Sequence, residues 1–419
     1  MKLTEQHIIK RTNDQFKKID QMCFMSKNLY NAALYTIKQE FEKTGKWIRY
    51  QELDKIIRNN YPDLYRNNSS SQQILMILDR NLKSFFEALK AYERKPEKFQ
   101  AKPEFPKYKN KKYGRNIFLY TSGNQLRLKD GLIHFPKREG IKPLKTRQNF
   151  KSIQQVRFVP KRGYYVIEVV YEIPDIQPLT TEKKYMSIDL GVNNLATCYT
   201  GTERSFIING RPLKSMNQFY NKKLAKLQGQ IPKNSKRKSS RKIEKLALKR
   251  NNKIKDYMHK ASKKIVEICR NQGITDIIIG KNDGWKQEVD LGRKNNQNFV
   301  FIPFNNFISQ LIYKEFRVGI RVQELNESYT SKCSALDLEE VRYHKKYLGQ
   351  RGVSKKRQKT QKKPSKIHRG LFRTSYKRLI NSDLNGSMNI FRKGTSDELF
   401  IRTFPGSIGF VNNPIKIAV

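Results

Sequence analysis

One stretch constrains this chain more than any other: residues 183–200, which read KKYMSIDLGVNNLATCYT. The apolar run before Asp189 predicts a buried strand that delivers this carboxylate to its end. Gly191 interrupts the run, and apolar alternation resumes at Leu195, as in a half-buried second strand. The stretch therefore predicts a hairpin with one acid at its mouth, which is either a turn aspartate or a ligand of a metal ion.

The segments after this hairpin predict the rest of an α/β sheet. SFIING predicts a third strand, helical spacing follows, and the continuous apolar run 274–280 predicts a buried strand. A helix is predicted from about Asn305 to Phe316, and a further strand from Ile320 to Leu325. Three strands in series, then helix, strand, helix and strand, form an RNase H-like order, so we predict a mixed five-stranded sheet with flanking helices.

The first part of the chain predicts a different architecture. Residues 1–15 supply one strand, and residues 16–100 carry helical apolar stripes until Pro96 changes the pattern. Residues 101–180 read as short strands separated by glycine-containing turns. We predict a small antiparallel β-barrel that the N-terminal strand completes across a helical insertion.

The charge of the chain indicates its partner. Eighty-six Lys and Arg stand against 37 Asp and Glu, a formal net charge of +49 spread along the whole sequence. Such an excess repels itself in a compact protein, so a polyanion such as nucleic acid is expected to balance it. A membrane-surface role is disfavoured, because no apolar run approaches the roughly 20 residues of a spanning helix and the N-terminus lacks the apolar core of a signal peptide.

The four cysteines are Cys23, Cys198, Cys269 and Cys333, and none forms a CxxC pair. A disulfide scaffold and a structural zinc site are therefore both improbable, and a reducing cytoplasm is the default compartment.

A two-metal nuclease site at Asp189 needs further carboxylates at neighbouring strand ends, because oxygen ligands must bridge two Mg²⁺ ions about 4 Å apart. Asp283 follows the apolar strand 274–280, and Glu327 follows the next strand. Asp383 opens an amphipathic segment, where a helix N-terminus favours an acid.

Several motifs, taken in order, resemble those of TnpB proteins, transposon-encoded relatives of type V CRISPR effectors with a RuvC-like nuclease half. They are IDLGVNNLAT, ESYTSKCS, RGLF and NSDLNGSMNIFRK. The resemblance extends from about residue 20 to the C-terminus. It implies that Asp189 is the first RuvC acid and Asp383 the third.

This chain departs from the usual family pattern at the second acid. Many TnpB proteins carry a glutamate at the end of the apolar strand, where Gly280 stands here. Either the chain has lost an acid and binds without cutting, or Glu327 replaces it from the loop after the adjacent strand, a shift of about 4.8 Å. We favour Glu327, since ESYTSK is typical of the branch with a relocated acid and no zinc-finger cysteines.

The resemblance also assigns the domains. Residues 1–15 and 101–180 would form a wedge barrel, and residues 16–100 a helical recognition domain. Residues 181–332 would form the RuvC domain, 333–369 a basic insertion in place of the zinc finger, 370–395 the final RuvC helix, and 396–419 a tail. By its composition, the stretch 345–369 is expected to be flexible and to engage nucleic-acid strands.

Basic residues near these segments are the candidates for nucleic-acid contact. They are Lys107, Lys109, Lys111, Lys112, Arg115, Lys281, Arg351, Lys355, Lys356, Arg357 and Arg369.

The resemblance implies an RNA-guided DNA endonuclease. A guide RNA from the transposon end would pair with one strand of a double-stranded DNA target, and the protein would read a short flanking motif. Two Mg²⁺ ions, which Mn²⁺ can replace, would be held by Asp189, Glu327 and Asp383, and no zinc is expected. A monomeric ribonucleoprotein in a prokaryotic cytoplasm is expected.

Three alternatives stay open. A nuclease-inactive RNA-guided repressor would bind DNA without cutting it. A transposase acting directly on transposon ends would cleave without guide RNA. A basic RNA-packaging protein would account for the charge, although not for three acids at strand and helix ends.

Overall fold

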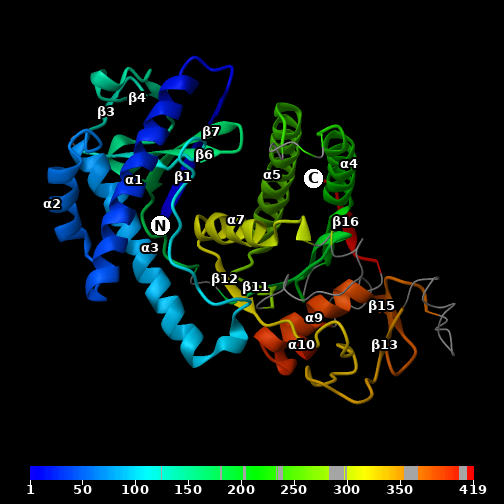
Figure 1. Cartoon of the computed structure of the whole chain (residues 1–419). Helices are drawn as coiled ribbons and strands as arrows, with labels where there is room; N and C mark the ends of the chain where they lie inside the picture. Colours follow the sequence, from blue (N-terminus) through cyan, green and yellow to red (C-terminus); the bar gives the residue numbers. More distant parts are fainter. Residues whose placement is uncertain are drawn as a thin grey trace. The chain divides into compact units, whose positions relative to one another are not determined.

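The computed structural model of the protein describes residues 1–123, 125–179, 182–201, 204–232, 234, 239–282, 297, 300–352, 367–404 and 413–419 (Figure 1). The chain divides into two compact units, Met1–Asp175 and Ile176–Val419. The division precedes the one predicted between residues 180 and 181. Among the helices that the structure describes, none combines the length and apolar character needed to cross a bilayer.

Helices form one part of the first unit. They are α1 (Phe16–Thr44), α2 (Tyr50–Asn60) and α3 (Asn68–Arg94), followed by a short 3₁₀ turn at Pro96–Lys98. Their apolar stripes meet in one core that includes Leu34, Ile57 and Leu78. The predicted helical character of residues 16–100 is thus observed, and Pro96 ends it.

Strands form the rest of the first unit. They are β1 (Lys2–Lys10), β2 (Phe118–Thr121), β3 (Arg127–Lys129), β4 (Leu132–His134), β5 (Leu144–Lys145), β6 (Ile153–Lys161) and β7 (Tyr164–Glu172). Strand β1 pairs antiparallel with β7 along its whole length, so the N-terminal strand does join strands beyond the helical insertion. The described strands form two sheets, β1-β7-β6-β2 and β3-β4-β5, where a single barrel was predicted.

A mixed sheet of six strands organises the second unit. Its strands are β8 (Tyr185–Leu190), β9 (Asn194–Tyr199), β10 (Phe206–Asn209), β11 (Asp276–Gly280), β12 (Arg321–Leu325) and β16 (Ile415–Ile417). Their order is β12-β11-β8-β9-β10-β16. The first five match the predicted strands. The sixth corrects the prediction, because β16 belongs to the segment expected to be a tail and pairs parallel with β10.

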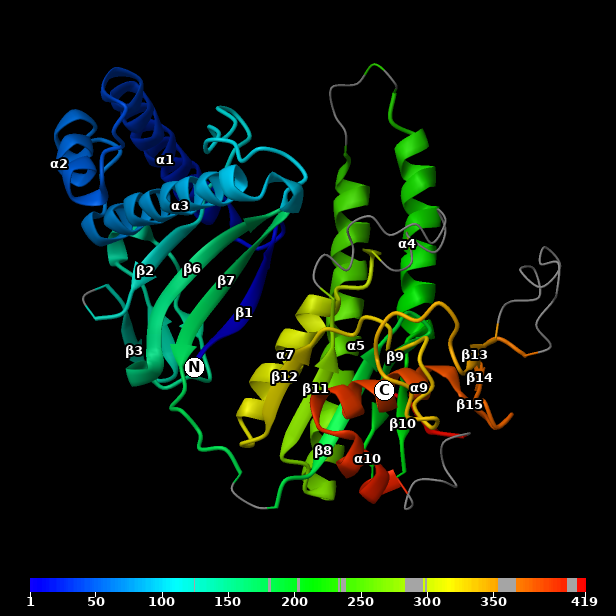
Figure 2. The same cartoon turned by 90° about the horizontal axis from the view of Figure 1, so that it is seen from below.

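Helices cover the two faces of this sheet. The helices are α4 (Arg211–Gly229), α5 (Arg241–Gln272), α7 (Phe304–Phe316), α9 (Ser382–Gly394) and α10 (Asp397–Thr403). Helices α4 and α5 lie side by side (Figure 2). Residues of α4, α5 and α7 share one core with Met186, Ile188, Ile277 and Ile279.

Helix α9 packs on the opposite face, against the strand residues that alternate with these. Ser187 and Asp189 of β8, and Ile278 and Gly280 of β11, face α9. Strand alternation thus places the Asp189 carboxylate on the α9 side of the sheet.

A small third sheet precedes α9. Strands β13 (Gln350–Arg351), β14 (Leu371–Arg373) and β15 (Leu379–Asn381) pair antiparallel in that order. Within the stretch 345–369, Gln350 and Arg351 are paired in this sheet, and β14 follows the stretch. Residues 353–366 lie outside the described residues.

The buried carboxyl of Glu315 on α7 generates a pH-dependent prediction. Its side chain is fully buried, and neither carboxyl oxygen has a hydrogen-bond partner in the described part of the chain. Burial raises the pKa of Glu315 from 4.5 to about 8. Between these two values only the unfolded chain releases the proton, so this group makes the fold less stable as the pH rises.

We expect the effect of Glu315→Gln on the free energy of unfolding to depend on pH. The substitution should be more favourable at about pH 8 than at about pH 5, by roughly 1–3 kcal/mol. Melting temperatures at the two pH values measure the difference. Glu267→Gln, at a half-exposed acid of α5 paired with Lys263, is the control and should show no such pH dependence. An equal effect of Glu315→Gln at both pH values would contradict the assignment.

Candidate functional site

Asp189 lies near the end of β8 and points toward α9. Hydrogen bonds between Ser187 and Ser387 hold the strand against the helix, with 2.7 Å from Ser187 Oγ to the Ser387 carbonyl and 3.0 Å from Ser387 Oγ to the Ser187 carbonyl. The close approach continues at Gly386, where a Cβ atom would lie 2.6 Å from Asp189 Oδ2. Glycine at 386 therefore provides the space that the Asp189 carboxylate occupies.

Glu327 follows β12 by two residues, as predicted, and its carboxylate lies over Gly280. A Cβ atom on Gly280 would lie 2.9 Å from Glu327 Oε2 and would also meet Ile390 Cδ1. The amide of Glu327 donates to Asn282 Oδ1 at 3.1 Å, which ties the loop to the end of β11. The Glu327 carboxylate thus occupies the space that a side chain at Gly280 would take.

Asp383 begins α9, in the first turn, where the helix dipole favours a negative charge. Its helix is capped by Asn381, whose Oδ1 accepts from the amides of Asp383 and Leu384. Asn194 Nδ2 donates to Asp383 Oδ2 at 2.7 Å, and Arg351 Nη2 donates to Oδ1 at 2.7 Å. Strand β9, the small sheet and α9 therefore converge on this carboxylate.

The charges of Glu327 and Asp383 both act on the carboxyl group of Asp189. Burial, then Glu327, then Asp383 raise the pKa of Asp189 well above its usual range, and Arg351 opposes this rise. Burial raises the pKa of Glu327 to about 7. Negative charges gathered in a buried place favour a bound cation, because a cation removes both the repulsion and the desolvation penalty.

The oxygen atoms of Asp189 and Glu327 fit a divalent metal ion in their chemistry. Glu327 Oε2 is buried without a hydrogen-bond partner among the described residues, and the Glu327 charge acts on Asp189. An unpartnered carboxylate oxygen beside a second acid is what a hard cation such as Mg²⁺ requires. Within the described ranges no ready-formed group of three metal ligands is present. Arg351 and Asn194 engage both oxygens of Asp383.

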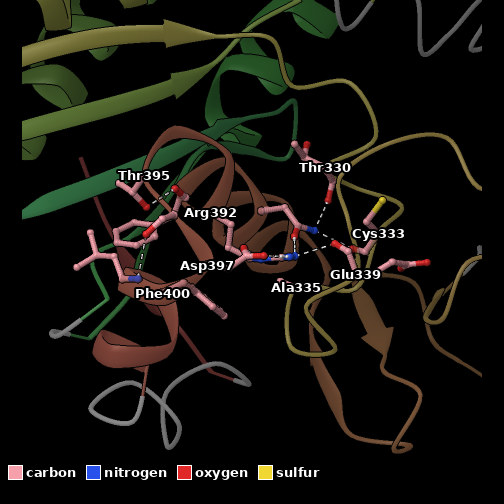
Figure 3. A network of polar contacts seen from close by, with 12 residues as sticks. Thr330, Cys333, Ala335, Glu339, Arg392, Thr395, Asp397 and Phe400 are labelled. Atoms are coloured by element: carbon pink, nitrogen blue, oxygen red, sulfur yellow. Dashed lines mark hydrogen bonds and ion pairs between the residues drawn. The ribbon is translucent and has the colours of Figure 1, made fainter.

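A polar hub holds the segment after Glu327 against α9. The hub comprises Asn385, Asn389 and Arg392 of α9, with Glu339 and Asp397. Asn389 Nδ2 donates to the carbonyls of Thr330 and Cys333, both at 2.8 Å, and Asn385 Nδ2 also donates to Cys333, at 2.8 Å (Figure 3).

Arg392 closes the hub from the other side. Its guanidinium is buried, pairs with Asp397 at 2.7 and 3.1 Å, and donates to the Glu339 carbonyl at 3.0 Å (Figure 3). Arg392 also donates to Asn389 Oδ1 at 2.8 Å, which orients the amide that binds the Glu327 segment. The hub thus holds Thr330, Cys333 and Glu339, which follow Glu327 in the chain, against the helix that begins near Asp383.

The predicted nucleic-acid contacts fall into several groups. In the first unit, Lys111 and Lys112 are exposed, Lys107 pairs with Glu104, and Lys109 is half-buried. Arg115 forms an ion pair with Asp20 at 2.7 Å, so the fold of this unit uses its guanidinium.

In the second unit, Lys281 pairs with Glu324, Arg351 reaches Asp383, and Arg369 is exposed. Lys355, Lys356 and Arg357 lie outside the described residues, as does Asp283.

Sequence reasoning missed the residues that support the acids. Asn194 stands in the GVNNLAT turn, Asn282 two residues after Gly280, and Gly386 in the NSDLNGSMN segment. An asparagine or glycine beside a candidate acid was the available signal, but only the packing of α9 shows which of them matter.

Two family models match the chain. Residues 168–286 match OrfB_IS605, described as a probable transposase, and residues 304–390 match the Cas12f1-like TNB domain. Asp189 lies in the first matched segment, and Glu327 and Asp383 lie in the second.

Solved structures of low identity also match. A Cas12f1–sgRNA–target DNA complex is 14% identical with a TM-score of 0.37, and the match covers 93% of this chain and 98% of that one. A CRISPR-Cas12f ternary complex is 13% identical with a TM-score of 0.37, and the match covers 89% and 80%. A search of curated proteins found no match.

The polar hub generates a prediction about the segment that carries Glu327. Asn389→Ala removes two donated bonds and one accepted bond at a fully buried site, so we expect it to destabilise the second unit by about 2–4 kcal/mol. Hydrogen exchange at the amides of Thr330 and Cys333 should accelerate more than exchange in the strand β9. Asn252→Ala, on an exposed turn of α5, is the control and should be nearly neutral. Unchanged exchange at Thr330 and Cys333 would contradict the role of the hub.

Proposed function

We infer that this chain belongs to the TnpB-like family, and we propose that it is an RNA-guided DNA endonuclease that cleaves phosphodiester bonds at Asp189, Glu327 and Asp383. The position of Glu327 carries the proposal. Its carboxylate lies over Gly280, with a buried oxygen free of hydrogen bonds within the described residues, and its charge acts on Asp189.

The three acids would hold two Mg²⁺ ions, which Mn²⁺ can replace. When bound, such ions activate a water for attack on phosphorus and stabilise the leaving oxygen. In this arrangement Asp189 would be the central acid, because the charges of both Glu327 and Asp383 raise the pKa of Asp189. The packing of α9 keeps the carboxylates in place, so little rearrangement is needed when the substrate arrives.

The charge of the chain supports a nucleic-acid partner. A net charge of +49 suits a guide RNA paired with one strand of target DNA, whose phosphates the protein contacts irrespective of sequence. Exposed Lys111, Lys112 and Arg369 are proposed contacts, and the basic insertion is proposed to lie along the strand to be cut. The RNA would come from the transposon end.

The decisive experiment uses the chain purified with its bound nucleic acid. Sequencing that nucleic acid should reveal one RNA with a variable end, and this RNA should direct Mg²⁺-dependent cleavage of a matching DNA duplex. Cleavage without the RNA would instead indicate a transposase that acts directly on DNA, and guided binding without cleavage would indicate a nuclease-inactive repressor.

The acids are tested one at a time in the same complex. We expect Asp189→Asn, Glu327→Gln and Asp383→Asn each to reduce the cleavage rate by about 100-fold or more, with DNA binding nearly retained. Glu324→Gln, at the acid of β12 that pairs with Lys281, is the matched control and should cleave at nearly the normal rate. Near-normal cleavage by Glu327→Gln would show that another residue supplies the second acid.

Gly280 provides an independent test of the relocated acid. Gly280→Ala places a methyl group against Glu327 Oε2 and Ile390, so we expect cleavage to fall about 10- to 100-fold as the carboxylate is displaced. The control Gly229→Ala, at the end of α4 with nothing within 4 Å of the new atom, should cleave normally. In the double variant Gly280→Ala, Ile390→Val, the contact with Ile390 Cδ1 is removed and the contact with Glu327 Oε2 remains. Full recovery of the cleavage rate in this variant would show that displacement of Glu327 was not the cause of the loss.

A further inference from the structure

The three acids of the site differ in how their oxygens are engaged. Glu327 Oε2 has no hydrogen-bond partner among the described residues. Asp383 is the opposite case, since Arg351 engages Oδ1 and Asn194 engages Oδ2, each at 2.7 Å. A carboxylate proposed to bind a cation is therefore already bound by a guanidinium.

The small sheet delivers Arg351 to this position. Strand β13 pairs with β14, and β14 pairs with β15, whose last residue Asn381 caps α9 in front of Asp383. The sheet β13-β14-β15 thus connects the strand that carries Arg351 to the start of the helix that carries Asp383.

Two glycines let β13 approach so closely. A Cβ atom on Gly352 would meet the backbone of His368, and one on Gly349 would meet the ring of Phe372. The backbone on both sides of Arg351 is therefore fixed, and the amide of Gly352 donates to the Leu371 carbonyl at 2.8 Å. The guanidinium reaches Asp383 from an anchored strand, although the following residues 353–366 are not described.

Arg351 supplies the positive charge of the acid cluster. The Arg351 charge lowers the pKa of Asp189 and so opposes the rise caused by burial and the other acids. Arg351 also contacts Asp383 directly. Two lysines near these strand ends are engaged elsewhere: Lys281 pairs with Glu324 of β12, and Lys393 donates to the Asn326 carbonyl at 2.7 Å. The Arg351 side chain is 46% exposed and that of Asp383 30% exposed, so water can reach the pair.

We infer that Arg351 is a positioning residue that acts as the counter-cation of Asp383 in the metal-free protein, and that a divalent cation binds Asp383 by displacing its guanidinium from Oδ1. The inference rests on the proposed function, because it concerns the same three acids. An exposed ion pair is weak, so the guanidinium holds Asp383 in place without blocking the exchange. The displaced guanidinium stays beside the acids, where it can donate to a phosphate oxygen.

A purely structural ion pair leads to the opposite expectation. If Arg351 only braced the small sheet, its removal would loosen Asp383 and weaken metal binding. If it competes with the metal for Oδ1, its removal strengthens metal binding. The direction of the change in affinity therefore separates the two roles.

The test measures Mn²⁺ binding to the full-length chain without RNA, since RNA itself binds Mn²⁺. Electron paramagnetic resonance of free Mn²⁺ gives the Kd. We expect Arg351→Ala to lower the Kd by about 3- to 10-fold, from the loss of one competing charge. Arg351→Lys keeps the charge and should remain within about two-fold of the unmodified chain.

The matched control is Arg373→Ala. Arg373 lies on β14, is exposed, and donates to Gln350 of the same sheet at 3.0 Å. Among the described residues it makes no hydrogen bond or ion pair with Asp383. Its removal subtracts the same charge from the same sheet and should leave the Kd within about two-fold. Melting temperatures of all variants confirm that the fold is retained.

An unchanged or higher Kd in Arg351→Ala would overturn the inference, and so would an equal decrease in Arg373→Ala. Saturable binding that disappears in Asp189→Asn shows that the measured site is the acid cluster. If no variant binds Mn²⁺ in a way that depends on Asp189, the metal centre of the proposed function is itself wrong, which is a different failure from an unchanged Kd.

Discussion

Close packing of helix α9 on the sheet is the constraint on which the candidate site depends. Two short side chains, Ser187 and Ser387, bond across the contact, and Gly386 leaves room for the Asp189 carboxylate. Near the other end of the helix, Gly394 lies against Ile278 of β11. A larger residue at these positions would separate the helix from the strands, and Asp383 would leave the neighbourhood of Asp189.

This packing brings like charges together, and the surrounding side chains reduce the resulting repulsion. Asn194 and Arg351 donate to Asp383, while Asn282 holds the backbone of Glu327. The carboxyl group of Glu327 stays only partly satisfied, so its pKa rises to about 7. Apolar side chains at these positions would make the fold more stable than buried acids do. The proposed cation site gives a reason for the acids.

The segment between Glu327 and the small sheet has no zinc-binding cysteine pairs, yet it is anchored. Hydrogen bonds from Asn385, Asn389 and Arg392 hold this segment against α9, because each of these side chains binds a backbone carbonyl of the segment. The Cys333 thiol donates to the Arg342 carbonyl at 3.5 Å and takes part in the same packing. A connected polar network of this kind holds a loop only when all its members are bonded.

The sequence by itself determined the alternating strand that carries Asp189, the parallel strands at 274–280 and 320–325, and the helix that begins near Asp383. Local apolar periodicity and capping chemistry suffice for these elements. It also pointed to Glu327 as the acid opposite Gly280. The sixth strand β16 and the two separate sheets of the first unit were beyond it, because strand pairing between distant segments leaves little local signal. Only the tertiary structure decided which glycines and asparagines serve the acids and that Arg351 reaches Asp383. Those contacts join β8, β12, β13 and α9, which are distant in sequence, and they exist only once the chain has packed.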